Sequence, residues 1–197
     1  GSLDQARIAA MLLLTLRGTP FIYQGDELGM ENVDIPPHLV QDPQGKNLPG
    51  YTRDVARTPM HWSDEPNAGF TTGTPWLPLA DNYKTFNVET ERANPRSILN
   101  LYQRLLSYRR ITPALMLGSF HALDDQPDDC FLYVREYENT SRLIALNFAN
   151  APQTLHLEGL AKDNTGRVVL STYLDREENA DLRSLHLRPN EGIIVEL

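Results

Sequence analysis

The sequence predicts an α/β segment followed by an all-β domain of antiparallel strands. Two observations lead to this fold class. An apolar helix, a short apolar run and a polar turn follow one another within the first thirty residues, which is the order of elements in an α/β layer. Beyond Leu115, seven short apolar runs are separated by turn residues, as in antiparallel sheets. The one cysteine excludes an internal disulfide framework, so packing must hold the fold together.

The first predicted helix spans Asp4 to Arg17 and is apolar on most of its faces. A helix of this kind is normally buried between layers. Gly18-Thr19-Pro20 ends it, because glycine and proline stop helices. The run Phe21-Ile22-Tyr23 is too short for a helix and is flanked by glycine and proline, so we expect a buried strand there.

No helical or strand period is visible from Met30 to about Ala93, where prolines and aromatic residues are scattered. Long loops without secondary structure are usually functional or disordered. The aromatic residues favour an ordered loop, since disordered segments contain few of them. Asn94 and Pro95 then predict the start of an amphipathic helix that continues to about Arg110.

The runs after Leu115 predict an antiparallel sheet or sandwich. They are Gly118–Leu123, Phe131–Tyr137, Leu143–Phe148, Thr154–Leu157, Val168–Tyr173, Ser184–Leu187 and Ile193–Leu197. The predicted domain boundary falls near residue 115, with a first domain over residues 3–114 and a second over residues 115–197.

Composition excludes several classes of partner. The net charge of -8 and the lack of a basic run argue against a nucleic-acid partner, whereas a neutral sugar is compatible with an acidic surface. No segment is long enough to span a bilayer, so we expect no membrane partner. The single cysteine fits a reducing compartment, and we expect a cytoplasmic location.

Taken singly, the polar groups indicate little chemistry. Asp26-Glu27 is either a functional carboxylate pair or an ordinary polar turn, and the composition of turns favours the second. The five histidines have no ligand spacing, and no phosphate-binding glycine loop is visible, so we expect neither a metal nor a cofactor. Nothing near Cys130 would lower the pKa of its thiol, which favours a small core residue over a nucleophile.

The exception is the stretch from Tyr51 to Trp62, which places Arg53, Asp54 and Arg57 in an aromatic-rich loop. Arginine is suited to sugar hydroxyls and to carboxylates, and aromatic faces suit the apolar sides of sugar rings. The residue types leave two alternatives open. One is a sugar-binding loop, and the other is an arginine–aspartate pair that only folds the loop.

Together these segments resemble the α-amylase superfamily and, within it, the oligo-1,6-glucosidase and α-glucosidase branch. Residues 18–30 (GTPFIYQGDELGM) look like the eighth barrel strand and its turn, and residues 53–62 (RDVARTPMHW) look like the signature loop of the branch. Residues 94–110 resemble the closing barrel helix. The resemblance implies that residues 3–114 are the last part of a (β/α)8 TIM barrel and that residues 115–197 are a β-sandwich.

The resemblance also implies a retaining mechanism with an aspartate nucleophile, a glutamate acid/base and a further aspartate preceded by histidine. It places all three upstream of this chain, so we expect no catalytic residue here and no activity of the chain alone. It implies a sugar-binding role for Arg53 first and Arg57 second. His61 stands where relatives usually carry glutamine, and we expect it to support the loop.

The expected parent enzyme hydrolyses α-glucosidic bonds in short oligosaccharides, which makes an oligosaccharide the expected partner. A trehalose- or sucrose-converting transferase or isomerase is the alternative. A non-catalytic carbohydrate-binding or interaction protein is a third, and the intact arginine loop argues against it. Part of a barrel would expose apolar faces, so we expect self-association or pairing with an upstream chain.

Overall fold

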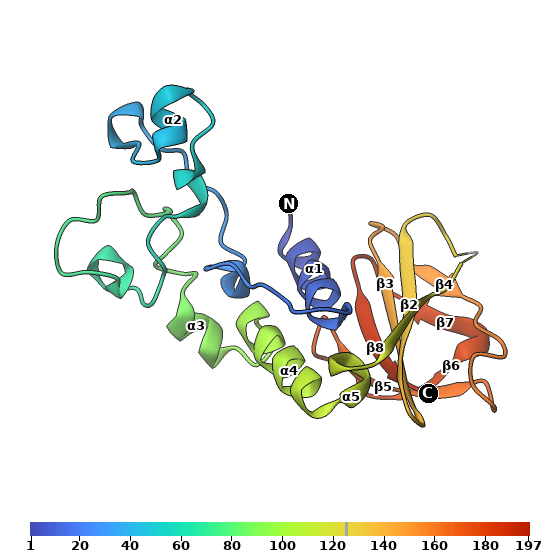
Figure 1. The fold of residues 1–197 in the computed structure, drawn as a ribbon. Helices are drawn as coiled ribbons and strands as arrows, with labels where there is room; N and C mark the ends of the chain where they lie inside the picture. Colours follow the sequence, from blue (N-terminus) through green and yellow to red (C-terminus); the bar gives the residue numbers. More distant parts are fainter. Residues whose placement is uncertain (125) are drawn as a thin grey trace. The chain divides into compact units, whose positions relative to one another are not determined.

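The computed structural model describes residues 1–124 and 126–197. Figure 1 shows the helices and strands in chain order. The α-helices are α1 (Leu3–Thr15), α2 (Pro43–Asn47), α3 (Val88–Ala93), α4 (Ile98–Ile111) and α5 (Pro113–Met116). The strands are β1 (Ser119–Ala122), β2 (Cys130–Tyr137), β3 (Thr140–Asn147), β4 (Gln153–Leu155), β5 (Thr165–Ser171), β6 (Asn179–Asp181), β7 (Leu185–Leu187) and β8 (Gly192–Glu196). Short 3-10 helices are η1 (Asp26–Leu28), η2 (Pro37–Leu39), η3 (Arg53–Ala56), η4 (Pro66–Gly69) and η5 (Leu182–Ser184).

Contacts divide the chain into two compact units. The first unit joins residues 1–21 to residues 101–197, and the second unit is residues 22–100. The boundary predicted near residue 115 lies inside the first unit, because α1 and α5 both pack on the sheet. The assignment of residues 3–114 to a barrel stays a prediction.

The sheets of the first unit are antiparallel throughout, as the sequence predicts. A six-stranded sheet has the order β1-β2-β3-β8-β5-β6, and β4 pairs with β7 in a second sheet. Each of the seven predicted runs falls on a strand. The sequence missed β6, in which Ala180 is the one buried residue, because a run of three residues with one small apolar side chain is too short to establish a period.

The central strands of the larger sheet are buried on both faces, which explains their continuous apolar runs. One face of β2, β3 and β8 shares a core with the smaller sheet. Its members include Leu132, Val134, Leu143, Ala145, Leu155, Leu185, Leu187, Ile193 and Val195. The helix α1 packs on β3 from the other face (Figure 1).

The predicted burial of the first helix holds for one of its faces. Ile8, Met11 and Leu14 are almost completely buried. A Cβ atom at Gly192 would lie 2.9 Å from the sulfur of Met11, so the missing side chain lets α1 approach β8. The helix ends at Thr15, two residues before the predicted end.

The carboxyl end of α1 is capped by a buried arginine from α4. Arg109 donates hydrogen bonds to the carbonyl oxygens of Leu14 at 2.8 Å, Leu16 at 3.1 Å and Gly18 at 2.6 Å. The last carbonyl groups of a helix have no partner inside it and carry partial negative charge. Arg109 therefore satisfies these carbonyl groups with a positive charge at the favourable end of the helix dipole.

A second buried arginine, Arg135 of β2, reinforces this cap. It donates to the carbonyl oxygen of Thr15 at 2.7 Å and to those of Gly118 and Ser119 at 3.0 Å. The Thr15 hydroxyl lies 2.5 Å from the hydroxyl of Tyr133, and burial raises the pKa of Tyr133 to about 12. These bonds join α1 to β2 through polar groups that would otherwise be buried without partners.

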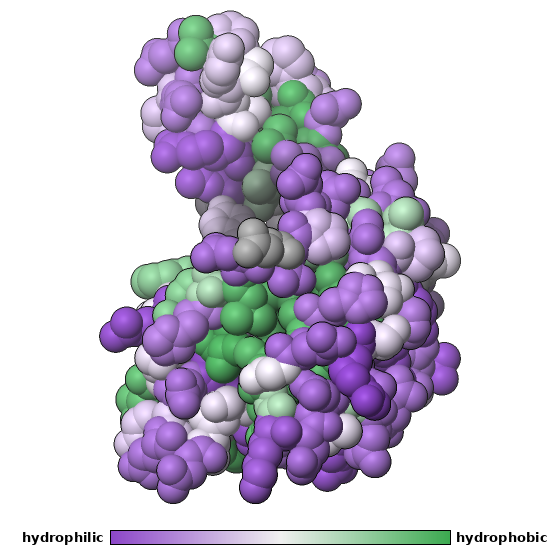
Figure 2. Space-filling view, turned by 90° about the vertical axis from the view of Figure 1, so that its right-hand side faces the viewer, coloured by the Kyte–Doolittle hydropathy of each residue, from purple (hydrophilic) through white to green (hydrophobic). Residues whose placement is uncertain are grey.

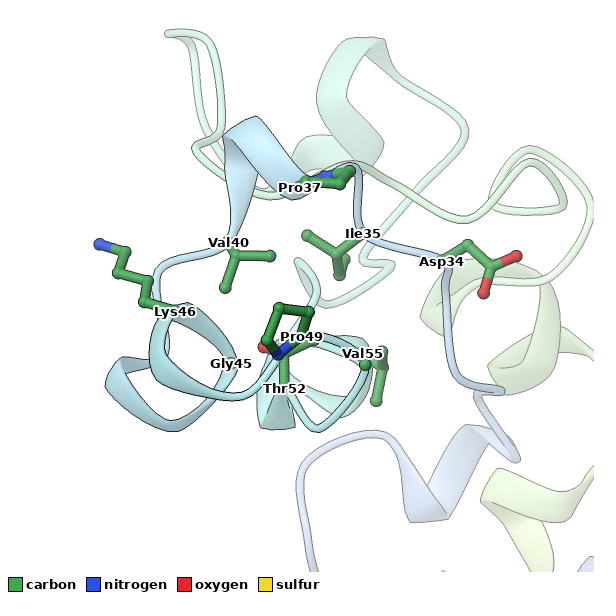
Figure 3. Close-up of a pocket in the computed structure, with 10 residues that line it drawn as sticks. Asp34, Ile35, Pro37, Val40, Gly45, Lys46, Pro49, Thr52 and Val55 are labelled. Carbon is green, nitrogen blue, oxygen red and sulfur yellow. The ribbon is translucent and has the colours of Figure 1, made fainter.

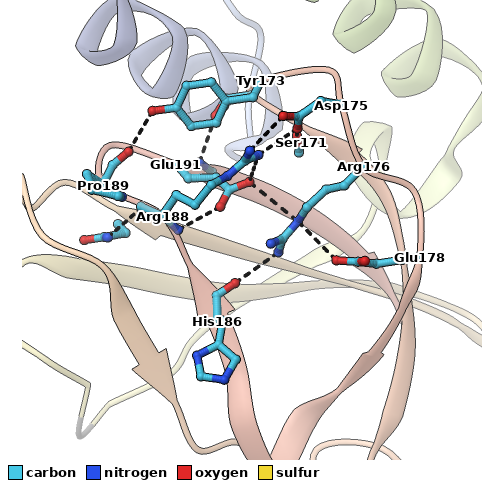
Figure 4. A network of polar contacts seen from close by, with 12 residues as sticks. Ser171, Tyr173, Asp175, Arg176, Glu178, His186, Arg188, Pro189 and Glu191 are labelled. Atoms are coloured by element: carbon cyan, nitrogen blue, oxygen red, sulfur yellow. Dashed lines mark hydrogen bonds and ion pairs between the residues drawn. The ribbon is translucent and has the colours of Figure 1, made fainter.

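A polar network ties together the connection before β6 and the connection before β8 (Figure 4). Arg188 donates to both oxygens of Asp175 at 2.7 Å and to buried Glu191, also at 2.7 Å. Its guanidinium lies 4.4 Å from the ring centre of Tyr173, in cation–π geometry. The paired carboxylates hold the pKa of Arg188 far above its usual range. The network fixes the β5–β6 connection against the β7–β8 connection.

The predicted buried strand at Phe21–Tyr23 is wrong. Residues 19–23 form neither helix nor strand, and Phe21 is 84% exposed. A strand needs a neighbour to pair with its backbone groups. None of the strands in the described part of the chain pairs with this run, so its apolar side chains reach solvent.

The second predicted helix begins later than expected. Asn94 ends α3 instead of starting α4, which begins at Ile98. The hydroxyl of Ser97 accepts a hydrogen bond from the Asn100 amide at 3.1 Å and so caps α4. The sequence Asn94-Pro95 therefore forms part of the connection between the two helices.

The second unit is built from short helices and turns around a small core. Leu28, Met60, Val88 and Leu99 are buried together, and Met30 and Phe86 pack against them. Within the described ranges, no helix of either unit is both long and apolar enough to cross a bilayer.

Replacing Arg109 by leucine is expected to lower the free energy of unfolding of the first unit by about 3 kcal/mol, because buried carbonyl groups lose charged donors. Denaturant unfolding followed by circular dichroism measures the loss. The matched control is Arg110→Leu, since Arg110 is the exposed neighbour on α4. Equal losses in both variants would contradict the capping role.

Candidate functional site

The loop that carries the candidate arginines is organised by the carboxylate of Asp54. This side chain is buried, and its Oδ2 accepts hydrogen bonds from the amides of Gln41 at 2.7 Å and Asp42 at 2.8 Å. The Thr52 hydroxyl donates to the same oxygen at 3.0 Å. Burial would raise the pKa of Asp54, but these donors outweigh burial and lower it. The carboxylate thus accepts hydrogen bonds from backbone amides that have no partner in a helix or strand.

Asp42 binds Arg53 in a two-pronged ion pair. Oδ1 of Asp42 accepts from Nη2 of Arg53 at 2.5 Å, and Oδ2 accepts from Nε at 3.0 Å and from the Arg53 amide at 2.9 Å. The Asp42 side chain is fully buried, whereas that of Arg53 is 57% exposed. The Arg53 guanidinium holds the pKa of Asp42 far below its usual range. Protonation of Asp42 at low pH would therefore weaken the loop.

Asp42 is a residue that the sequence analysis missed. Its local signal is the pair Asp42-Pro43, in which the carboxylate accepts from the Gln44 amide and caps α2. The alternative of an internal arginine–aspartate pair turns out to involve Arg53 and Asp42, which are separated by 11 residues. Asp54, the nearer acid, binds backbone groups instead.

Arg57 lies on the same loop with a free side chain. It follows η3 directly, and its amide donates to the carbonyl oxygen of Asp54 at 2.9 Å. Its side chain is exposed, and among the residues that the structure describes no group forms a hydrogen bond or ion pair with the guanidinium. The loop thus has one arginine that folds it and one that is available to a ligand.

Exposed aromatic rings occur on the same unit. Trp76 is 77% exposed, and Tyr51, Trp62 and Phe70 are each about half exposed or more. The Trp62 amide donates to the carbonyl oxygen of Ala68 at 2.9 Å, which holds Trp62 against the turn before Phe70. Exposed aromatic faces of this kind can stack on sugar rings.

A cavity of about 510 Å³ lies beside η3 (Figure 3). Ile35, Val40, Pro49 and Val55 face a common space, whereas Lys46 extends away from it. Sugar hydroxyls need converging polar partners, and these mostly aliphatic walls supply few. The exposed arginine and aromatic groups are therefore the better candidates for sugar contact.

The remaining candidates have structural roles or none. Asp26 and Glu27 accept hydrogen bonds from the amides of Tyr23 at 2.9 Å and Gly25 at 3.0 Å, which confirms the polar-turn interpretation. Cys130 packs against the core of the sheets, and burial raises the pKa of its thiol, as expected for a core residue. Over residues 1–124 and 126–197, no three acidic, histidine or cysteine side chains are grouped to hold a metal ion.

Comparison with curated proteins identifies relatives over nearly the whole chain. Oligo-1,6-glucosidase of Halalkalibacterium halodurans is 34% identical over 96% of this chain. Trehalose-6-phosphate hydrolase of Bacillus subtilis is 32% identical over 98% of it. The match covers 37% of each relative, so this chain spans well under half of their length.

Solved structures give the same result for the fold. Trehalulose synthase MutB from Pseudomonas mesoacidophila MX-45 matches with a TM-score of 0.84 and 32% identity, over 98% of this chain and 38% of that one. A MutB variant in complex with glucose matches with a TM-score of 0.85, and another was crystallised with its substrate sucrose. The shared architecture is a helical part followed by an antiparallel sheet.

A family match covers more than half of the sequence. Residues 2–118 match the α-amylase catalytic domain. These residues contain the turn at Asp26-Glu27, the arginine loop and helix α4, which are the segments that carry the resemblance in the sequence. The chain belongs to the α-amylase family.

Proposed function

We propose that this chain is part of a retaining α-glucosidase that hydrolyses α-glucosidic bonds in short oligosaccharides. In this proposal residues 3–114 complete a (β/α)8 barrel, and residues 115–197 form the β-sandwich that follows it. The observation that carries the proposal is the unpaired, exposed guanidinium of Arg57 on a unit with exposed aromatic rings. Relatives that are glucosidases support it. A cytoplasmic location is part of the same proposal.

Within this function, Arg57 is the sugar-contacting arginine and Arg53 positions it. The guanidinium of Arg53 is bound to Asp42, and this ion pair fixes the start of η3. Arg57 follows the end of η3, so the Asp42–Arg53 pair limits where its side chain can reach. This assignment reverses the order of preference that the sequence resemblance implies.

A sucrose-converting isomerase is the second candidate. The observation that favours it is the similarity to MutB, with a TM-score of 0.85 for the glucose complex. A hydrolase and an isomerase form the same covalent glycosyl-enzyme and differ in whether water or a sugar hydroxyl attacks it. The product of the intact enzyme acting on sucrose separates the two: free glucose and fructose indicate the hydrolase, and a new disaccharide indicates the isomerase.

The chain by itself is expected not to hydrolyse α-glucosides, because a retaining mechanism needs a nucleophile and an acid at the same bond. The carboxylates near Arg57 are occupied by backbone amides or by Arg53. The measurement is release of 4-nitrophenol from 4-nitrophenyl α-glucoside by the purified chain. Release above a buffer blank that persists through a second purification would contradict the expectation.

Replacing Arg57 by alanine is expected to weaken glucose or isomaltose binding about tenfold, because a charge-assisted hydrogen bond to a hydroxyl is lost. Both tryptophans, Trp62 and Trp76, lie in the second unit, so intrinsic fluorescence reports on this unit. Titration of the chain with each sugar gives the dissociation constant.

The matched control is Arg104→Ala, an exposed arginine on α4 outside the loop, which should leave the dissociation constant unchanged. Arg53→Ala should weaken binding and also shift the emission of the sugar-free chain, since it removes the ion pair that folds the loop. Unchanged binding in Arg57→Ala with a folded loop would exclude Arg57 as a sugar contact.

The chain alone is expected to self-associate through exposed apolar side chains. Phe21, Tyr23 and Trp76 are all more than half exposed. An apolar area surrounded by polar side chains is also visible in Figure 2, on the side where the sheets lie in Figure 1. Exposed patches of this kind mark interaction surfaces. Light scattering should detect species larger than a monomer, and fewer of them in Phe21→Ser. A monomer at all concentrations would contradict this expectation.

A further inference from the structure

His61 is buried in the segment that directly follows Arg57, and only one of its ring nitrogens has a partner. The residue is 1% exposed. Its Nδ1 lies 3.0 Å from the carbonyl oxygen of Phe86. Its Nε2 is buried, and no group in the described ranges forms a hydrogen bond with it. The burial and the bond to Phe86 agree with the loop-supporting role expected for His61.

These contacts fix the protonation state of the ring. A carbonyl oxygen only accepts hydrogen bonds, so Nδ1 must carry the hydrogen and donate it to Phe86. The neutral ring then has a bare lone pair at Nε2. A second proton would create a buried N–H group and a buried positive charge at Nε2, both without a partner, which is unfavourable.

Among the described residues, burial and the bond to Phe86 are the two effects that shift the pKa of His61. The elements packed against it are the turn from Tyr83 to Phe86, which carries Lys84, and the start of α3, which carries Glu89 and Glu91. The rings of His61 and Tyr83 lie in an edge-to-face arrangement, and their centroids are 6.3 Å apart. Burial lowers the pKa of His61, and the bond to Phe86 raises it. Burial is the larger effect, so the pKa lies below its usual value.

His61 also joins separate parts of the second unit. Its carbonyl oxygen accepts from the Val88 amide at 3.0 Å, and that of Trp62 accepts from the Glu89 amide at 3.2 Å. These two bonds hold the start of α3 against the segment from Thr58 to Ser63. Opening of the backbone that carries His61 would therefore break both bonds and release the start of α3.

We propose that His61 is an acid-sensitive latch: the gain of a proton at Nε2 opens residues 58–63 and loosens the loop that carries Arg53 and Arg57. The proposal does not depend on the proposed function, because it concerns the stability of the loop and not its ligand. Glutamine at this position, which does not titrate, would lack this sensitivity.

The direction of the effect follows from linkage. In the open form the ring is hydrated and has an ordinary pKa of about 6.5, whereas the closed form resists the proton. Stability is therefore complete above the ordinary pKa and falls as the pH drops below it. If the closed form stays neutral, the ratio of open to closed forms rises by up to about tenfold between pH 7.5 and 5.5.

Hydrogen exchange read by mass spectrometry tests the latch on the chain as it exists. His61→Asn keeps an N–H donor near the position of Nδ1 but cannot titrate. Peptides over residues 58–63 and 86–91 should open up to about tenfold more at pH 5.5 than at pH 7.5, relative to the same peptides of His61→Asn. The exposed His38 gives the matched control, since His38→Asn should behave as the unaltered chain. Equal pH responses in the unaltered chain and His61→Asn would overturn the proposal.

Nuclear magnetic resonance of the histidine rings tests the proposal without any change to His61. At pH 7.5 the ring should be in the neutral form with its proton on Nδ1. His61 in the folded chain should take up a second proton only at a lower pH than a hydrated imidazole does, because burial lowers the pKa of His61. A neutral ring that carries its proton on Nε2 at pH 7.5, or uptake of the second proton at the ordinary pKa of a hydrated imidazole, would overturn the proposal even where His61→Asn fails to fold.

Discussion

The arrangement of the arginine loop depends on two buried carboxylates, Asp42 and Asp54. A loop with little regular secondary structure must satisfy its backbone amides in some other way. Asp54 accepts two amides and one hydroxyl, and Asp42 accepts the amide and the guanidinium of Arg53. Because each acid is paired, both stay charged in a buried place. The exposed position of Arg57 follows from these bonds of Asp42 and Asp54, because they fix the backbone that leads to it.

The first unit also satisfies buried backbone groups with charged side chains, but there the side chains are positively charged. Its buried polar groups at the end of α1 are carbonyl oxygens, so the compensating side chains are donors. Arg109 and Arg135 fill this role with backbone oxygens as their acceptors. Burial lowers the pKa of both guanidinium groups, yet arginine keeps its proton at any physiological pH. A lysine could lose its charge here, which favours arginine at both positions.

The sequence predicts the antiparallel part of the fold well, because alternation and turn residues are local signals. It fails where the outcome depends on a distant partner. Phe21–Tyr23 has the composition of a strand, but no described strand lies beside it to pair with its backbone. For the site, residue type identifies both arginines, but it cannot separate them. Their difference comes from Asp42, which is 11 residues away from Arg53 and is brought close only by the fold.

The bonds of Asp42 and Asp54 also define where the loop can vary. They join Gln41 and Asp42 to Arg53 and Asp54, so the chain from Pro43 to Thr52 is a loop closed at its two ends. Lengthening a closed loop costs little additional entropy, because this cost grows only with the logarithm of its length. Insertions between residues 43 and 52 can therefore change the surroundings of the two arginines, while the bonds of Asp42 and Asp54 keep the arginine backbone in place.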